Sequence, residues 1–90
     1  MQQTISILVR GKVQGVFYRQ STREKALALG IAGTVRNRQD GAVYIIATGT
    51  KIQLDALLSW CRQGPPRALV TEVEWKEEEL RLYNGFNVER

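Results

Sequence analysis

The chain has 90 residues, 43% of them hydrophobic and 24% charged, as in an ordinary small globular protein, and its formal net charge is +4. It contains no histidine and a single cysteine, Cys61, which excludes imidazole catalysis and an internal disulfide and argues against a zinc site. No apolar run approaches the roughly 20 residues of a membrane span, and the first residues lack a signal-peptide pattern, so we expect one cytoplasmic domain covering residues 1–90.

The first predicted elements are a strand and a helix. Apolar and polar residues alternate along Thr4–Arg10, which predicts a strand with one buried face. The buried residues of this strand would be Ile5, Ile7 and Val9. The composition of Arg19–Leu29 predicts a helix that Gly30 terminates. Its core-facing residues would be Thr22, Ala26 and Leu29.

Two strands of a hairpin follow the first helix. They are Ile31–Asn37 and Ala42–Thr48, and both are rich in apolar residues. The segment between them ends in Asp40-Gly41, which is typical of a tight turn. We therefore expect the two strands to pair antiparallel.

The second helix has the clearest signals in the chain. Thr50 is a suitable N-cap, and Gln53 three residues later completes a capping box. Spacings of three, four and seven residues predict a buried stripe on this helix. Its members are Leu54, Leu57, Leu58 and Cys61. Gly64 and the following Pro65 end the helix.

Two more strands complete the predicted order. Leu69–Lys76 alternates, with one face predicted to carry Leu69, Thr71, Val73 and Trp75. Asn84-Gly85 indicates a tight turn before a short last strand, Phe86–Val88. The order β-α-β-β-α-β with a short fifth strand predicts an α+β fold of the ferredoxin-like, split βαβ type. In that fold two helices cover one face of an antiparallel sheet.

The connection between the first strand and the first helix indicates an anion site. Gly11–Arg19 reads G-K-V-Q-G-V-F-Y-R, and Gly15 allows a tight bend or a close approach to a ligand. The positive end of the helix dipole lies at the same place. Arg19 adds a planar fork of donors that suits two phosphate oxygens. We expect Val13 and Val16 to anchor this loop on the core.

Two segments resemble the acylphosphatase family. Gly11–Arg19 is similar to its signature G-x-V-Q-G-V-x-F-R, and Gly30–Asn37 (G-I-A-G-T-V-R-N) is similar to its G-x-x-G-x-V-x-N block. Asp40 follows at the usual distance, and the match extends over essentially the whole chain. Tyr18 stands where the family usually has Phe, so we expect its ring to keep a packing role and its hydroxyl to need a partner.

The resemblance implies hydrolysis of acyl phosphates to a carboxylate and inorganic phosphate, with no cofactor and no metal. Arg19 matches the family's phosphate-binding arginine, and Asn37 matches the asparagine that positions the attacking water. The resemblance also implies that the substrate's own phosphate takes the proton of that water. Backbone N–H groups of one loop match the phosphate cradle, and the loop consists of Gln14, Gly15, Val16, Phe17, Tyr18 and Arg19.

The chemistry of these residues agrees independently with that activity. A carboxylate is a good leaving group, so the reaction needs mainly positioning and charge stabilisation. Asn37 is no base, but its carboxamide has both a donor and an acceptor with which to hold a water. Because the first and second strands run parallel in a split βαβ unit, Arg19 and Asn37 should emerge at the same edge of the sheet.

Two other functions stay open at this point. An RNA-binding domain of this fold displays paired aromatics on its central strands, whereas Ala42–Thr48 has only Tyr44. A binding or regulatory module for an acyl phosphate would use the same cradle without turnover. We expect a monomer that acts on a small acyl phosphate and releases inorganic phosphate, without nucleic acid or membrane partners. Acetyl phosphate, carbamoyl phosphate and 1,3-bisphosphoglycerate share the reacting group, so the sequence does not choose among them.

Overall fold

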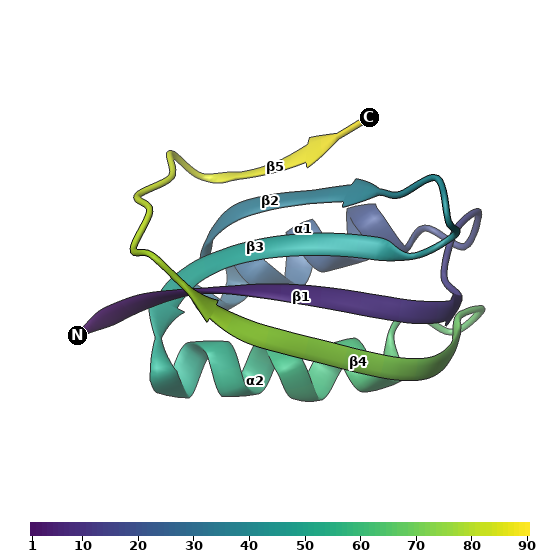
Figure 1. Cartoon of the computed structure of the whole chain (residues 1–90), viewed down its shortest axis with the longest axis horizontal. Coiled ribbons are helices and arrows are strands. Elements are labelled where there is room, and N and C mark those ends of the chain that lie inside the picture. Colours follow the sequence, from purple (N-terminus) through teal and green to yellow (C-terminus); the bar gives the residue numbers. More distant parts are fainter.

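The computed structural model describes all 90 residues, which form one sheet with two helices on one of its faces (Figure 1). In chain order the elements are β1 (Gln2–Lys12), α1 (Tyr18–Leu29), β2 (Ala32–Asn37), β3 (Val43–Thr50), α2 (Lys51–Gln63), β4 (Leu69–Glu78) and β5 (Phe86–Glu89). This is the predicted element order, and the bounds differ from the predicted ones by a few residues at most of the ends. Neither helix is long and apolar enough to span a membrane.

The five strands lie in the order β4-β1-β3-β2-β5. β3 pairs antiparallel with both β1 and β2, so β1 and β2 run in the same direction with β3 between them. This confirms the split βαβ, ferredoxin-like fold. β5 pairs parallel with β2, which makes the complete sheet mixed. The parallel pairing places the last residues of the chain beside the C-terminal end of β2.

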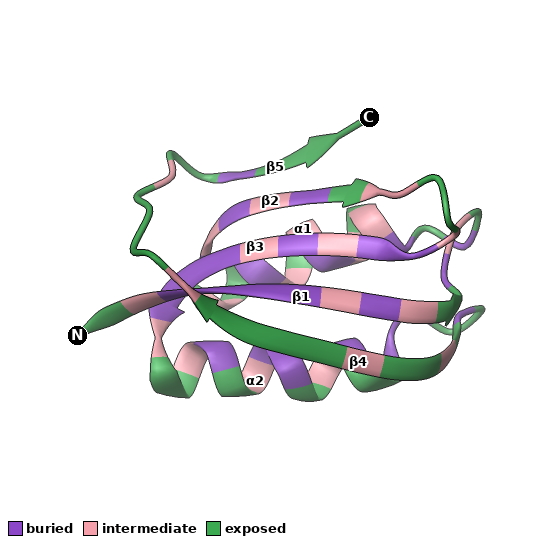
Figure 2. Cartoon of the chain, in the orientation of Figure 1, coloured by how far each residue is buried: buried purple, intermediate pink, exposed green.

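The core lies between the sheet and the two helices (Figure 2). Ile5, Ile7 and Val9 of β1 are at most 2% exposed, as the alternation predicts. The buried residues of α2 are those of the predicted stripe, namely Leu54, Leu57, Leu58 and Cys61. Burial of each large apolar side chain stabilises the fold by about 1.5–3 kcal/mol relative to exposure. The predicted capping box between Thr50 and Gln53 is also present and fixes the start of α2.

The face predicted for β4 is wrong in part. The pairing of β4 with β1 is irregular, because Arg10 pairs with Glu72 whereas Gly11 pairs with Val70. This bulge shifts the alternation of β4 by one residue. Val70 and Val73 therefore pack against the core. Leu69, beyond the bulge, is 66% exposed, although the simple alternation placed it with Val73. Trp75 keeps the register of Val73, since it pairs with Ile7, but it lies on an edge strand and is 52% exposed.

The connection between β4 and β5 is tied to the far end of the sheet. The Oγ1 atoms of Thr4 and Thr48 lie 2.6 Å apart. The backbone N–H of Arg81 donates to Thr4 Oγ1, and Thr48 Oγ1 donates to the Arg81 carbonyl. Gly33 N–H then donates to the Gly85 carbonyl at the start of β5. These bonds fix the path by which β5 returns along β2.

Candidate active site

The loop between β1 and α1 bends through two residues in the left-handed region. Gly15 has φ 74°, and Phe17, the N-cap of α1, has φ 64° and ψ 25°. A Cβ on Gly15 would meet no atom within 4 Å, so backbone conformation rather than space favours glycine there. Val13 and Val16 are buried beneath the loop, as expected of anchors. The loop is thereby held to the core while its backbone faces outward.

The backbone N–H groups of this loop and of the first helical turn are free. None of those from Gln14 to Gln20 donates a hydrogen bond within the protein. The first hydrogen bond of the helix runs from Ser21 N–H to the Phe17 carbonyl. No side chain caps α1, and no acidic residue lies in its first turn. A row of unpaired donors at the positive end of a helix is suited to an anion.

Arg19 lies in the first turn of α1 and points across to β5. Its Nη1 donates to the backbone carbonyl of Glu89 at 2.9 Å. It forms no ion pair with a carboxylate. One edge of the guanidinium is therefore oriented by the protein, and its remaining donors are available to a ligand.

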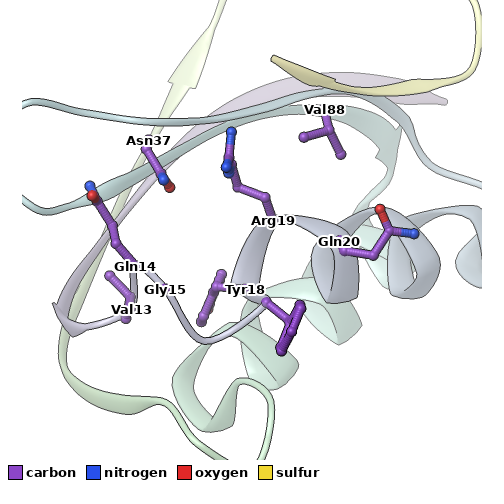
Figure 3. A pocket seen from close by; sticks show the side chains of 9 residues that line it. Val13, Gln14, Gly15, Tyr18, Arg19, Gln20, Asn37 and Val88 are labelled. Atoms are coloured by element: carbon purple, nitrogen blue, oxygen red, sulfur yellow. The ribbon is translucent and has the colours of Figure 1, made fainter. Parts of the chain in front are cut away.

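Asn37 is the last residue of β2, and its side chain points toward the same space as Arg19 (Figure 3). Its Oδ1 is buried and has no hydrogen-bond partner. A buried acceptor left unpaired costs about 1–3 kcal/mol, so such an atom calls for a bound water or ligand group. Asn37 Oδ1 is thus a hydrogen-bond acceptor without a protein partner at the edge of the cavity.

One cavity of about 350 Å³ brings these groups together (Figure 3). It is lined by Val13, Gln14, Gly15, Phe17, Tyr18, Arg19, Gln20, Asn37 and Val88. Every residue predicted for the site lines it except Val16, whose side chain is buried below the loop. The lining contains no Cys, Asp or Glu, and nowhere do three such side chains gather as a metal-binding cluster.

Two features of the cavity were missed by the sequence analysis. The Gln14 side chain binds the loop to the β2–β3 hairpin, since its Nε2 donates to the carbonyls of Arg38 at 2.8 Å and Ala42 at 3.0 Å. Val88 of β5 forms part of the wall. No local signal in the sequence reports either contact, because both depend on how distant strands pair.

Tyr18 secures the base of the loop to α2. Its ring is 1% exposed and lies 5.4 Å from the ring of Trp60, and its hydroxyl donates to the Cys61 carbonyl at 2.7 Å. The expected partner for the hydroxyl is therefore a backbone oxygen. Burial raises the pKa of Tyr18 far above its usual value, and burial likewise raises the pKa of the Cys61 thiol to about 12. Both groups therefore stay neutral at pH 7 and supply no anionic base or nucleophile, and the Tyr18 O–H is already bound to the Cys61 carbonyl.

Asp40 organises the β2–β3 turn next to Asn37. Its Oδ1 accepts from the backbone N–H of Ala42 at 3.1 Å, and its Oδ2 lies 3.1 Å from Arg38 Nη2 and 3.6 Å from Arg10 Nη1. The backbone hydrogen bond, followed by the charges of Arg38 and Arg10, lowers the pKa of Asp40. Asp40 stays charged at neutral pH and holds the turn without lining the cavity.

Comparisons with known proteins identify the family of this chain. The family model described as Acylphosphatase matches residues 5–88. An acylphosphatase of Acaryochloris marina is 46% identical over 86 residues, which are 96% of this chain and 92% of that protein. An acylphosphatase of Marinobacter nauticus is 56% identical over 71 residues, or 79% and 77% of the two chains. The structure of an acylphosphatase from Coxiella burnetii superposes with a TM-score of 0.95 at 40% identity, over 98% and 93% of the chains.

The matched region contains the whole cavity, from the loop after β1 to Val88. Similarity at this level of identity and coverage extends beyond the fold, which by itself hosts many functions. The chain belongs to the acylphosphatase family and is a hydrolase of acyl phosphates.

Proposed function

We propose that the enzyme cleaves the carboxyl-phosphate bond by direct attack of a water on phosphorus, with Arg19 and Asn37 as the catalytic residues. One observation carries this proposal, namely that three kinds of group line a single cavity. They are the unpaired backbone N–H groups of the loop, the Arg19 guanidinium, which binds the protein through Nη1 only, and the unpaired Oδ1 of Asn37. The N–H groups and the guanidinium suit a phosphoryl group, and the Asn37 oxygen suits the water that attacks it.

The phosphoryl group would lie against the loop formed by Gln14, Gly15, Val16, Phe17, Tyr18 and Arg19. Its oxygens would accept hydrogen bonds from the free N–H groups of that loop, including that of Val16, whose side chain is buried but whose amide makes no internal bond. Arg19 would bind the same group through the donors that Glu89 does not occupy. Such preorganised donors stabilise charge on the transferred group without reorganisation during the reaction.

Asn37 would order the nucleophile. A water that donates one hydrogen to Oδ1 has its lone pair free to face phosphorus. The new water O–P bond forms as the P–O bond to the acyl group breaks, and the carboxylate leaves with the electron pair. The Asn37 carboxamide is no base, and a phosphoryl oxygen of the substrate would take the released proton, as the resemblance to the family implies. The products are a carboxylate and inorganic phosphate.

The leaving group explains why the cavity contains no acid. A carboxylic acid has a pKa near 4, so its anion departs at neutral pH without protonation. The ionisable side chains at the cavity are Arg19 and Tyr18, and burial keeps the Tyr18 hydroxyl neutral and bound to the Cys61 carbonyl. Positioning and charge stabilisation remain as the sources of rate enhancement.

We also propose that the enzyme works without a metal or cofactor, as a monomer in the cytoplasm, and without nucleic acid. The cavity lining has no carboxylate or thiol that would hold a metal ion. The one cysteine is buried and unpaired, which suits a reducing compartment. The Arg36 guanidinium lies 5.0 Å from the Tyr44 ring centroid and covers the aromatic face that an RNA base would need.

The experiment is hydrolysis of benzoyl phosphate in ¹⁸O-labelled water with EDTA present. Attack on phosphorus places the label in inorganic phosphate, and undiminished turnover with EDTA agrees with a metal-free reaction. Label in the benzoate would show attack on the carbonyl carbon and overturn the mechanism. Loss of activity on chelation would overturn the metal-free reaction, and light scattering after gel filtration measures the oligomeric state.

A further inference from the structure

The direction of attack limits where the acyl group lies. In phosphoryl transfer the attacking and leaving oxygens lie roughly in line through phosphorus. With the water at Asn37, the acyl oxygen leaves on the side of phosphorus opposite Asn37. In Figure 3 Arg19 stands between Asn37 on one side and Val88 and Gln20 on the other, so with phosphorus bound at Arg19 the acyl group leaves toward the side that Val88 and Gln20 border.

The lining that remains for the acyl group is apolar. Gln14 is half-buried and its amide is bound to the β2–β3 hairpin on the side of Asn37. Apart from it, the loop backbone, Arg19 and Asn37, the exposed groups at the cavity are the side chains of Phe17, Gln20 and Val88. Phe17 is 75% exposed and Val88 is 37% exposed. The amide of Gln20 is turned along the helix, where Nε2 donates to Glu24 at 3.4 Å. An acyl group leaving toward Val88 therefore meets hydrocarbon and no second cation.

Phe17 has a conformation that packing does not explain. It is the only residue other than glycine with a positive φ, and a bulky side chain rarely adopts this region. Strain of this kind costs about 1–3 kcal/mol and collects at functional sites. Burial of the ring does not offset this strain energy, because three quarters of the ring surface is exposed to solvent. A glycine would fit the same backbone with less strain, so folding alone gives no reason for an aromatic ring there.

We propose that Phe17 and Val88 form an apolar contact for the acyl group, so that the enzyme prefers acyl phosphates whose acyl part is apolar. The inference rests on the proposed function, because the attacking water at Asn37 defines the side on which the acyl group leaves. The substrate class is thus an acyl phosphate with an aromatic or aliphatic acyl group and no second anionic group.

The arginines that could bind a second anionic group of a substrate lie on the side of Asn37, opposite the proposed position of the acyl group. Arg36 and Arg38 line a separate hollow that adjoins Asn37, on the side of the attacking water. Their charges are also engaged, since Arg38 Nη2 lies 3.1 Å from Asp40 Oδ2 and Arg36 lies over the Tyr44 ring. The distal phosphate of 1,3-bisphosphoglycerate would point away from both. We therefore expect this substrate to be disfavoured.

The experiment compares kcat/KM for benzoyl phosphate, acetyl phosphate and 1,3-bisphosphoglycerate. The benzoyl-to-acetyl ratio of each variant is divided by the wild-type ratio, which cancels the intrinsic reactivity of the substrates and any loop disturbance common to both. Phe17→Gly and Val88→Ser should each lower this ratio about three- to tenfold. Phe17→Leu, which keeps apolar bulk, should lower it less than Phe17→Gly.

Two controls separate this inference from other effects. Leu82→Ala removes an apolar side chain that is 78% exposed and outside the cavity, and its ratio should equal that of wild type. Arg36→Gln should leave the rate with 1,3-bisphosphoglycerate unchanged. Unchanged ratios in both Phe17→Gly and Val88→Ser would overturn the inference. So would a preference for 1,3-bisphosphoglycerate that Arg36→Gln abolishes. Failure of the proposed function is a separate result, ¹⁸O label in the carboxylate, which these ratios do not measure.

Discussion

Arg19 Nη1 donates a 2.9 Å hydrogen bond to the backbone carbonyl of Glu89, 70 positions later in the chain. The bond joins the first turn of α1 to β5, which exists at this place only because β5 pairs parallel with β2. It orients one edge of the guanidinium and leaves the others directed at the cavity. The last strand therefore takes part in presenting the proposed phosphate-binding residue.

Arg19→Ala should lower kcat/KM for benzoyl phosphate about 10³-fold or more, because a cation on the transferred phosphoryl group is worth that much. Its free energy of unfolding should change by less than about 0.5 kcal/mol, since the lost hydrogen bond is exposed. The measurements are steady-state kinetics and urea unfolding. Arg23→Ala is the matched control, because Arg23 Nε also joins α1 to β5, donating to the Phe86 carbonyl at 3.0 Å. It should lose about 1 kcal/mol of stability and keep its activity; equal activity losses in the two variants would contradict the assignment.

Asn37→Ala should lower kcat about 10²- to 10³-fold and change KM little, since it removes the acceptor that orders the water but no phosphate donor. Steady-state kinetics with benzoyl phosphate separates the two parameters. Asn87→Ala, at an exposed position in β5, should behave as wild type. A raised KM with unchanged kcat in Asn37→Ala would assign Asn37 to substrate binding instead.

Gln14→Met should lower both the free energy of unfolding and kcat. The substitution keeps the length of the side chain but removes Nε2, which leaves the carbonyls of Arg38 and Ala42 without this donor. Because both carbonyls keep a backbone donor, from Gly41 N–H and Arg38 N–H respectively, we expect a loss of only about 0.5–1.5 kcal/mol in urea unfolding. Activity should fall because the loop is no longer fixed relative to Asn37. Gln39→Met, in the adjacent exposed turn, is the control and should behave as wild type. A Gln14→Met enzyme with wild-type kcat would show that the hydrogen bonds between the loop and the hairpin are not needed for catalysis.

Tyr18→Phe should lower the free energy of unfolding by about 0.5–1.5 kcal/mol, the net value of the hydrogen bond from the hydroxyl to the Cys61 carbonyl. Its kcat should stay close to that of wild type, because the ring continues to fill the space beside Trp60. Chemical unfolding and benzoyl phosphate kinetics test the two statements together. A large loss of kcat with unchanged stability would instead place the hydroxyl in the reaction.

The contribution of Asp40 to the stability of the fold should be lost in acid. Its pKa is lower in the folded protein than in the unfolded chain, so its stabilising contribution is complete above the unfolded value near 4 and is lost as the pH falls through the folded value. Asp40→Asn should therefore destabilise the protein at pH 6, and this effect should diminish as the pH is lowered below about 4. Unfolding measured across this pH range follows the change, and an effect that stays constant would exclude this charge as the cause.

Local patterns were sufficient to predict most of the fold, and the family resemblance predicted the members of the proposed site. Alternation placed Ile5, Ile7 and Val9 in the core, and the spacing of Thr50 and Gln53 located the start of α2, because these signals involve residues a few positions apart. The resemblance of the two blocks predicts Arg19 and Asn37 as partners in the site, and both residues line the same cavity.

Tertiary structure alone decided how the proposed site is supported. The bulge in β4, the parallel pairing of β5, the Gln14 side-chain bonds and the Arg19–Glu89 contact all depend on strand register between distant segments. Strand register is set by the packing of the whole sheet, so no single segment encodes it. By itself the sequence determined the element order, the core faces of β1 and α2 and the chemistry of a phosphate site. The packed sheet decided which backbone groups stay unpaired and which residues line the cavity on the proposed acyl side.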